Sequence, residues 1–291
     1  MSLPSSPSSS SSATKNDWSA SQYLLFNNER TRPVHDLISQ VKPHLKQTPH
    51  PRIYDLGCGP GNSTQALLTH FPTAHITGLD TSPAMLAKAR ATLPDVEFVA
   101  ADVATLTPAD VPAADILFSN AVFHWLRSAQ RIPALTHLLR SLPPGGVLAL
   151  QVPDNYTQPS HTLMRATAVL PRQSWAAAFA GAGVGDLAVE ARPDLDPIEA
   201  PGVFYDALSP FAQVVHVWRT EYMHVLEDAR AIVEWVRGTG LQPFLQRIED
   251  DGVREEFLDE YERALKGAYR EMGDGKVLLG YPRLFVVAVR K

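Results

Sequence analysis

The segment Asp55-Leu56-Gly57-Cys58-Gly59-Pro60-Gly61 closes a short run, residues 52–57, that has the residue types of a buried strand. Glycines at alternate positions let the backbone turn sharply after a strand and let a ligand approach closely. The third glycine comes one residue earlier than in the dinucleotide pattern G-x-G-x-x-G. We therefore expect a tighter turn, and the spacing disfavours a NAD-dependent dehydrogenase.

Strand and helix patterns alternate on both sides of this segment. Helical patterns cover residues 62–70 and 82–93. Short apolar runs predict strands at residues 52–57, 75–80, 96–102, 114–120 and 146–152. Strands that alternate with helices form βαβ units, so the pattern predicts an α/β fold with a parallel sheet.

The second half of the chain has a different pattern. Helical spacing of apolar residues returns at 229–236 and 253–269, and residues 213–218 are a candidate sixth strand. The apolar run 284–289 suits a final strand. We therefore expect a mainly helical cap, residues 155–275, inserted before a last strand that rejoins the sheet.

Three acidic residues stand at the ends of three successive predicted strands. Asp55 precedes the glycine turn, where a carboxylate can receive an ammonium group, and Asp80 ends the second strand. Asp80 is placed to accept both hydroxyls of a ribose, and Asp102 to bind an exocyclic amine of adenine. The plainer alternative is that these acids cap helices. Because the carboxyl ends of parallel strands border one crevice, we favour a nucleoside site.

Composition limits the remaining classes of protein. The 291 residues carry 26 Lys and Arg against 31 Asp and Glu, a formal charge of −5, which disfavours a nucleic-acid partner. A single cysteine, Cys58, excludes an intrachain disulfide and a Cys-cluster zinc site and favours a reducing, cytoplasmic compartment. We expect no bound metal. No run of 18 apolar residues is present, so we expect no membrane span.

The glycine segment together with Asp80 and Asp102 resembles the Rossmann-like class I methyltransferases that use S-adenosylmethionine. Further segments resemble the trans-aconitate methyltransferase family. They are residues 17–19, 23–24, 26, 29–33, 120–125, 151–155, 159–161, 232–241 and 281–288. The Ser-rich N-terminal extension and residues 182–203 lie outside this resemblance.

The resemblance implies a mostly parallel Rossmann-like sheet with an antiparallel last strand. It divides the chain into a disordered tail, residues 1–14, an S-adenosylmethionine-binding core, residues 15–154, the substrate cap, residues 155–275, and the last strand, residues 276–291. It also implies esterification of a carboxylate of a small polycarboxylic acid, with trans-aconitate as the first candidate.

Two sets of site residues come with the resemblance. The cofactor set comprises Tyr23, Arg32, Asp55, Gly57, Gly59, Gly61, Asp80, Thr81, Met85, Asp102, Val103 and Asn120. The substrate set comprises His124, Trp125, His161, Tyr205, Arg219, Tyr281 and Arg283. In this scheme Met85 packs on adenine, and Arg219 and Arg283 bind the carboxylates that do not react. Tyr23 and Arg32 belong to an N-terminal segment that closes over the cofactor.

The chemistry of a carboxylate acceptor needs no general base, because a group with a pKa of about 4 is already ionised near pH 7. The protein has to hold and orient the acceptor, and the bidentate guanidinium of Arg suits its carboxylates. Three alternatives stay open: a different polycarboxylic or isoprenoid acid, a hydroxyl acceptor, or a non-catalytic S-adenosylmethionine-binding regulator. The oligomeric state stays open as well.

Overall fold

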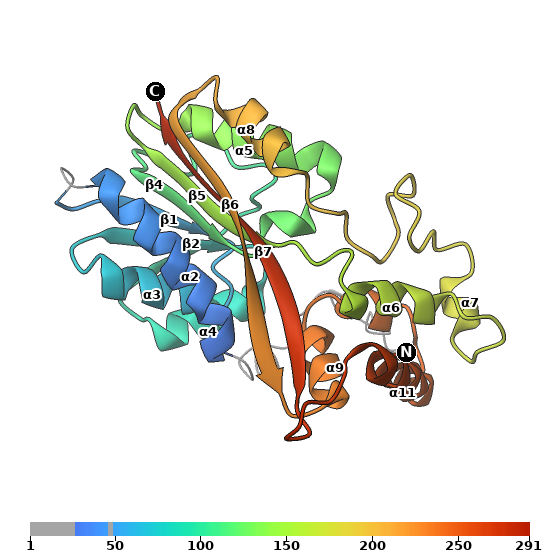
Figure 1. The fold of residues 1–291 in the computed structure, drawn as a ribbon. Helices are drawn as coiled ribbons and strands as arrows, with labels where there is room; N and C mark the ends of the chain where they lie inside the picture. Colours follow the sequence, from blue (N-terminus) through green and yellow to red (C-terminus); the bar gives the residue numbers. More distant parts are fainter. Residues whose placement is uncertain (1–26, 46–48) are drawn as a thin grey trace, which may run out of the picture.

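The computed structural model describes residues 27–45 and 49–291, and its centre is a seven-stranded sheet in the order β3-β2-β1-β4-β5-β7-β6 (Figure 1). The strands are β1 (Arg52–Leu56), β2 (His75–Asp80), β3 (Glu97–Ala100), β4 (Ile116–Asn120), β5 (Val147–Pro153), β6 (Ala212–Leu226) and β7 (Val277–Arg290). The first five are parallel, and β7 runs antiparallel between β5 and β6. The expected fold class, with its antiparallel last strand, is confirmed.

Helices cover both faces of this sheet. They are α2 (Asn27–Val41), α3 (Asn62–His70), α4 (Pro83–Thr92), α5 (Ser128–Ser141) and α8 (Pro201–Leu208). Alternate residues of a strand point to opposite faces, and β7 shows the result. Phe285 and Val287 pack with α2 and α3, whereas Leu284 and Val286 pack with α5 and α8.

The strand order reverses between β1 and β4. The chain leaves β1 towards β2 and β3 on one side, then returns to place β4 on the other side of β1. In open α/β sheets this reversal leaves a crevice at the carboxyl ends of the strands. The glycine segment and the ends of β2 and β4 therefore lie around one crevice.

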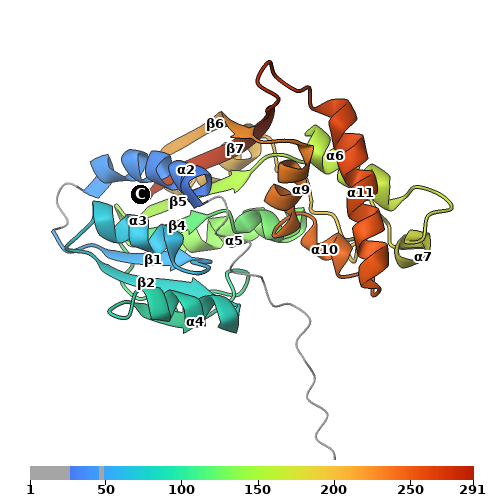
Figure 2. The same ribbon diagram turned by 90° about the horizontal axis from the view of Figure 1, so that it is seen from below.

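A second group of helices lies beside the sheet, at the carboxyl ends of the parallel strands (Figure 2). These cap helices are α6 (Pro159–Ala168), α7 (Ala176–Phe179), α9 (Ala229–Arg237), α10 (Gln242–Leu245) and α11 (Asp251–Ala268). They share a separate apolar core in which Trp235, Phe257 and Tyr261 are fully buried. The start of β7, including Tyr281, also belongs to this core.

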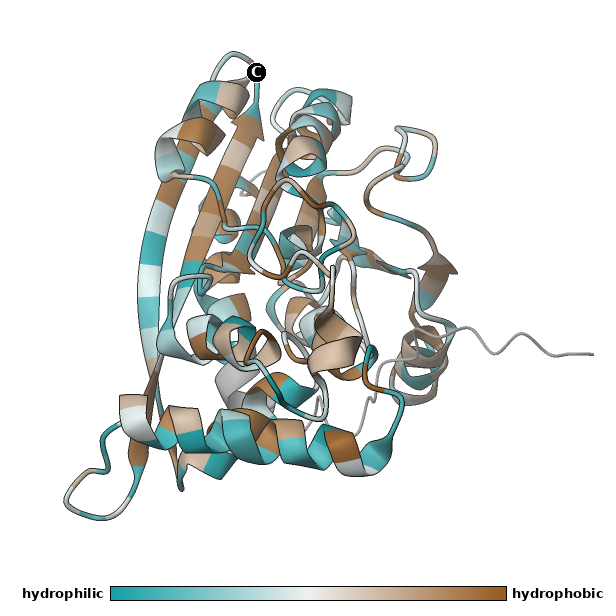
Figure 3. Cartoon of the chain, turned by 90° about the vertical axis from the view of Figure 1, so that its right-hand side faces the viewer, coloured by the Kyte–Doolittle hydropathy of each residue, from teal (hydrophilic) through white to brown (hydrophobic). Residues whose placement is uncertain are grey.

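The edge strand β6 is longer than the predicted strand at residues 213–218. It pairs with β7 from Ala212 to Leu226, and it divides the cap helices into a part before it and a part after it. Its polar stretch Arg219-Thr220-Glu221 ended the apolar run that the prediction relied on. Figure 3 shows the inner strands as mainly hydrophobic and the middle of β6 as hydrophilic. An edge strand tolerates polar and charged residues because solvent reaches one side of it.

Within the described parts of the chain, no helix combines the length and the apolar character that crossing a bilayer requires.

Candidate active site

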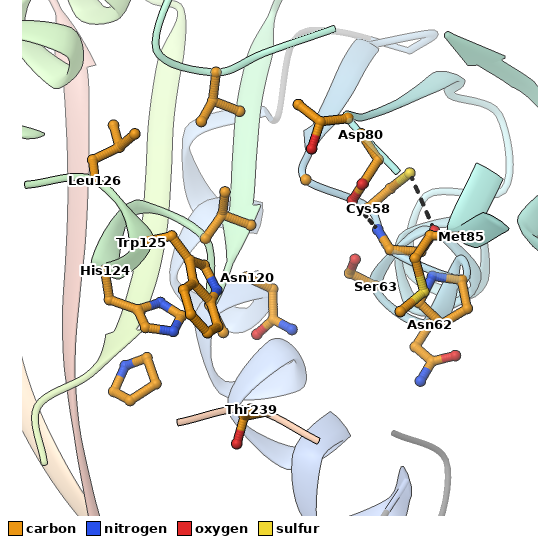
Figure 4. A pocket seen from close by; sticks show the side chains of 18 of the residues that line it. Cys58, Asn62, Ser63, Asp80, Met85, Asn120, His124, Trp125, Leu126 and Thr239 are labelled. Atoms are coloured by element: carbon orange, nitrogen blue, oxygen red, sulfur yellow. Dashed lines mark hydrogen bonds between the residues drawn. The ribbon is translucent and has the colours of Figure 1, made fainter. Parts of the chain in front are cut away.

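A cavity of about 340 Å³ lies between the strand ends and the cap. One end is formed by the glycine segment, Asp80 and Met85, and the other by His124, Trp125 and the cap residue Thr239 (Figure 4). The remaining predicted residues that line it are Gly57, Gly59, Thr81, Asp102, Val103, Asn120, Tyr281 and Arg283. The cavity therefore joins the two predicted sets of residues in one space.

The glycine turn matches the conformation that its sequence predicts. Gly57 has a φ of 69°, and a Cβ atom there would lie 2.2 Å from the Val122 side chain. Gly59 has a φ of 55°, and a Cβ there would meet no described atom within 4 Å. Only glycine adopts this conformation without strain. Gly57 therefore permits close packing of the turn, while Gly59 leaves open space over the backbone where a ligand can lie.

The carboxylate of Asp80 fixes the turn to the second strand. Its Oδ2 atom accepts a hydrogen bond from the Gly59 amide at 2.9 Å, and its Oδ1 atom accepts one from the Ser82 amide at 2.8 Å. Each oxygen keeps a lone pair for a ligand hydroxyl. Asp102 also lines the cavity, and its Oδ1 atom accepts a bond from the Ala104 amide at 2.9 Å. It therefore caps a turn and faces the cavity at once.

Asp55 occupies a different place from Asp80. It is fully buried behind the glycine turn and accepts hydrogen bonds from Ser63 Oγ at 2.7 Å and Thr64 Oγ1 at 2.6 Å. Burial raises the pKa of its carboxyl to about 6. Asp55 does not line the cavity, because its side chain turns back to the first turn of α3. Both hydroxyls donate to its Oδ2 atom, and the expected contact of Asp55 with an ammonium group stays a prediction.

The cofactor end of the cavity fits an adenosyl group. Asp80 supplies acceptors for ribose hydroxyls, the buried side chains of Met85 and Val103 supply apolar surface for a base, and the space over Gly59 is open. Gly61 caps α3 with a φ of 96° and lies outside the cavity lining. Three residues of the predicted cofactor set thus remain outside the lining, Asp55, Gly61 and Arg32, and a fourth, Tyr23, lies outside the described residues.

A buried arginine, Arg283, lies in the wall of the same cavity as His124 and Trp125, although it is far from them in the sequence. The residue is 4% exposed, and its Nη1 atom donates to Gln151 Oε1 at 2.9 Å. Gln151 in turn donates through Nε2 to Asn120 Oδ1. The guanidinium carbon lies 5.2 Å from the centre of the Tyr281 ring. These contacts fix a cation in the cavity wall, where a carboxylate can bind it.

Two half-buried histidines, His124 and His161, lie at this end of the cavity. His124 also lines a smaller neighbouring cavity, which contains His161. The pKa of both imidazoles is lowered to about 3, mainly by burial, and the charges of Arg131 and Arg283 contribute to the lowering for His124. His161 Nδ1 lies 3.0 Å from Ser160 Oγ. Both imidazoles are therefore neutral near pH 7 and can donate hydrogen bonds without adding charge.

Comparison with known proteins agrees with this geometry. The family description "Methyltransferase domain" matches residues 53–146. The chain is 48% identical to the trans-aconitate 2-methyltransferase of Afipia carboxidovorans, over 94% of this chain and 99% of that protein. It is also 48% identical to the enzyme of that name from Methylobacterium radiotolerans, over 94% and 98%. The chain belongs to the trans-aconitate 2-methyltransferase family.

Membership in this family makes the chain an S-adenosylmethionine-dependent methyltransferase, as the sequence resemblance predicted. A solved structure, the YcgJ protein from Bacillus, has a TM-score of 0.53 at 13% identity, with 88% of this chain and 98% of that chain covered. This second likeness concerns the fold alone.

The structure separates the predicted substrate residues of this family member into two groups. His124, Trp125, Tyr281 and Arg283 line the main cavity, and His161 lines its neighbour. Tyr205 and Arg219 line neither of these two cavities. The Tyr205 residue is 52% exposed on α8, and the Arg219 side chain is 49% exposed and pairs with Asp154 at 2.8 Å.

Strand register explains why Arg219 and Arg283 do not lie together. Arg219 of β6 is paired with Leu284 of β7, whereas Arg283 is paired with Thr220. Neighbouring residues of a strand point to opposite faces of the sheet, so Arg219 lies on the face that Leu284 shares. The expectation that both arginines point into the crevice is corrected to Arg283 alone.

Two cap residues in the cavity wall were missing from the predicted set. Trp235 of α9 and Thr239, in the turn after that helix, both line the main cavity. Their segment, residues 232–241, is one of those that carry the family resemblance. The family resemblance therefore pointed to this segment, but the helical spacing of its apolar residues indicated only a core position for Trp235. Trp235 belongs to the core of the cap and to the cavity wall.

Proposed function

We propose that this chain transfers the methyl group of S-adenosylmethionine to a carboxylate oxygen of trans-aconitate. The products are a methyl ester and S-adenosylhomocysteine. Two supports carry the proposal: the relatives that share 48% of its residues bear that activity in their names, and Arg283 is a buried cation in the cavity wall. A cavity wall with a buried cation suits a small acceptor that carries several negative charges.

In this proposal the cofactor lies across the glycine turn. Asp80 accepts hydrogen bonds from the ribose, Met85 and Val103 pack against adenine, and Asp102 binds the edge of the base. The backbone at Asn120 meets the methionine portion. S-adenosylmethionine then supplies an electrophilic methyl group on a sulfonium. The residues of this end hold the ligand and carry out no proton transfer.

At the acceptor end, we assign unequal partners to the carboxylates. Arg283 binds a carboxylate that does not react, because its fork is a strong bidentate partner. A reacting carboxylate in such a pair would be a poorer nucleophile. The neutral donors His124 and His161 therefore suit the reacting group, and Trp125 and Tyr281 shape the wall around it.

The low pKa of the two histidines has a consequence for the rate. An imidazole with a pKa of about 3 is a weak base at neutral pH, and a carboxylate needs none. We expect the rate of methyl transfer to be nearly flat from about pH 6.5 to 9. A rate in pre-steady-state measurements that falls steeply below pH 7.5 contradicts a carboxylate acceptor.

The direct test is turnover on a panel of acceptors. The protein is incubated with S-adenosylmethionine and with trans-aconitate, its cis isomer, a saturated tricarboxylate, an isoprenoid acid, an alcohol and an amine. S-adenosylhomocysteine and the methylated product are measured by mass spectrometry. We expect the highest kcat/KM for trans-aconitate. Turnover only on the alcohol or amine, or cofactor binding without any turnover, contradicts the proposal.

A further inference from the structure

The acceptor side chains His124 and Trp125 stand on a very short turn. This 3-10 turn, η3 (Phe123–Trp125), has two backbone hydrogen bonds, from the Trp125 amide to the Val122 carbonyl and from the Leu126 amide to the Phe123 carbonyl, at 2.9 and 3.2 Å. Ala121, two residues before this turn, has a φ of 58°, a region that residues with a side chain rarely adopt. The turn therefore needs support from outside to keep one geometry.

Arg131 of α5 provides that support. Its side chain is fully buried, its Nε atom donates to the Phe123 carbonyl at 3.0 Å, and its Nη2 atom donates to the Leu126 carbonyl at 2.9 Å. One guanidinium thus holds the backbone on both sides of His124 and Trp125. Arginine alone has a rigid fork that can reach two carbonyls at once.

The opposite edge of the same guanidinium holds a loop. Arg131 Nη1 donates to the Pro197 carbonyl at 3.1 Å and pairs with Glu199 Oε2 at 2.6 Å. Residues 181–200 contain no helix or strand, yet part of this loop lines the smaller cavity with His124 and His161. Arg131 therefore links the acceptor turn to the loop that closes its far side.

We propose that Arg131 is a positioning residue, which sets the orientation of His124 and Trp125 for the acceptor without touching it. The expected loss of kcat/KM rests on the proposed function. The expected loss of order in the η3 turn rests on the geometry alone. It concerns a residue that lies outside both predicted sets and outside the main cavity lining.

The chain offers a matched control. Arg127, four residues earlier, donates to the carbonyls of Glu190, Arg192 and Asp194 at 2.7 to 2.8 Å and pairs with Asp196. It holds the same loop, but none of these bonds reaches the η3 turn. The variants Arg131→Lys and Arg127→Lys make the same chemical change at both places, and only the first weakens the bonds to the turn.

The first measurement is independent of activity. Hydrogen exchange is compared between wild type and both variants. We expect Arg131→Lys to speed exchange in residues 121–127 at least about tenfold, and Arg127→Lys to speed it in residues 185–196 only. Exchange in residues 62–70 should be unchanged in both. Equal protection of residues 121–127 in wild type and Arg131→Lys overturns the proposal.

The second measurement is kinetic. With Arg131→Lys we expect kcat/KM for trans-aconitate to fall at least about tenfold, because a small misplacement of positioning groups is costly. The affinity for S-adenosylhomocysteine should stay within about threefold, since the cofactor end is untouched. An equal loss in Arg127→Lys, or an equal loss of cofactor affinity, overturns the proposal. If wild type itself methylates no acid, the proposed function fails, and hydrogen exchange alone decides the role of Arg131.

Discussion

Replacing Arg283 by Met tests the assignment of the acceptor end most directly. The variant keeps the length and apolar stem of the side chain, removes its charge, and deprives Gln151 Oε1 of its donor at 2.9 Å. Arg283 is only 4% exposed, so water cannot take its place beside a bound carboxylate. Loss of one partner of such a buried pair costs about 2–5 kcal/mol. At 1.4 kcal/mol per tenfold, kcat/KM should fall between about 30-fold and 4,000-fold.

Arg219→Met is the control for this experiment, because it removes the same charge from the same sheet. The Arg219 side chain is half exposed, and its pair with Asp154 is worth about 0–1 kcal/mol after screening by solvent. We expect a change in kcat/KM of at most about fivefold. Both variants are assayed with trans-aconitate at saturating S-adenosylmethionine, at a temperature where thermal unfolding shows them folded.

Two outcomes refute the reasoning about Arg283. Retention of wild-type kcat/KM within about fivefold by Arg283→Met would show that no carboxylate depends on it. If kcat/KM falls as much in Arg219→Met as in Arg283→Met, acceptor binding does not depend on the face of the sheet on which an arginine lies. Titration with S-adenosylhomocysteine completes the test, because an equal loss of cofactor affinity would move Arg283 to the cofactor site.

Three further predictions concern single residues. Burial lowers the pKa of His161 to about 3, so below about pH 6.5 the unfolded chain binds more protons than the folded one. Denaturation should show the free energy of unfolding of wild type falling, relative to His161→Gln, by about 0.7 kcal/mol from pH 7 to 6 and by about 1.2 kcal/mol from pH 6 to 5. Gly59→Ala and Gly275→Ala both place a side chain at positive φ, and each should lower the free energy of unfolding by about 1–2 kcal/mol. Only Gly59 lines the cavity, so calorimetry should find weaker S-adenosylhomocysteine binding for Gly59→Ala alone. Asp80→Asn should weaken that binding by about 1.5–3 kcal/mol, and unchanged affinity would remove Asp80 from the cofactor site.

The core of the fold was predictable because its signals are local. Helix α3 and strand β2 match the predicted ranges 62–70 and 75–80, since apolar periodicity and the flanking Gly and Pro residues lie within each segment. The position of Asp80 at a strand end followed from the same local pattern. Those signals bring the cofactor end of the cavity together without any knowledge of the cap.

The acceptor end was less predictable because distant pairing decides it. Arg219 and Arg283 are equivalent in sequence, as each lies beside an apolar run. The register of β6 against β7, more than sixty residues later in the chain, places them on opposite faces. The surroundings of Asp55 were hidden for a related reason, because only the folded position of α3 shows that Ser63 and Thr64 both donate to its Oδ2 atom.

The site keeps a fixed charge over the working range of pH. An ionised His124 would lie beside Arg131 and Arg283, and the charge of both residues, together with burial, holds its pKa at about 3. The guanidinium of Arg283 stays protonated at any pH that the protein survives. If these residues bind the acceptor as we propose, the protein side of acceptor binding does not titrate between about pH 6 and 9, and the remaining titration belongs to the acid itself, with carboxyl pKa values of about 4. The proposed site then predicts that selection among small acids depends on the number and spacing of their carboxylates, because the Arg283 guanidinium and the two neutral imidazoles stand at fixed positions.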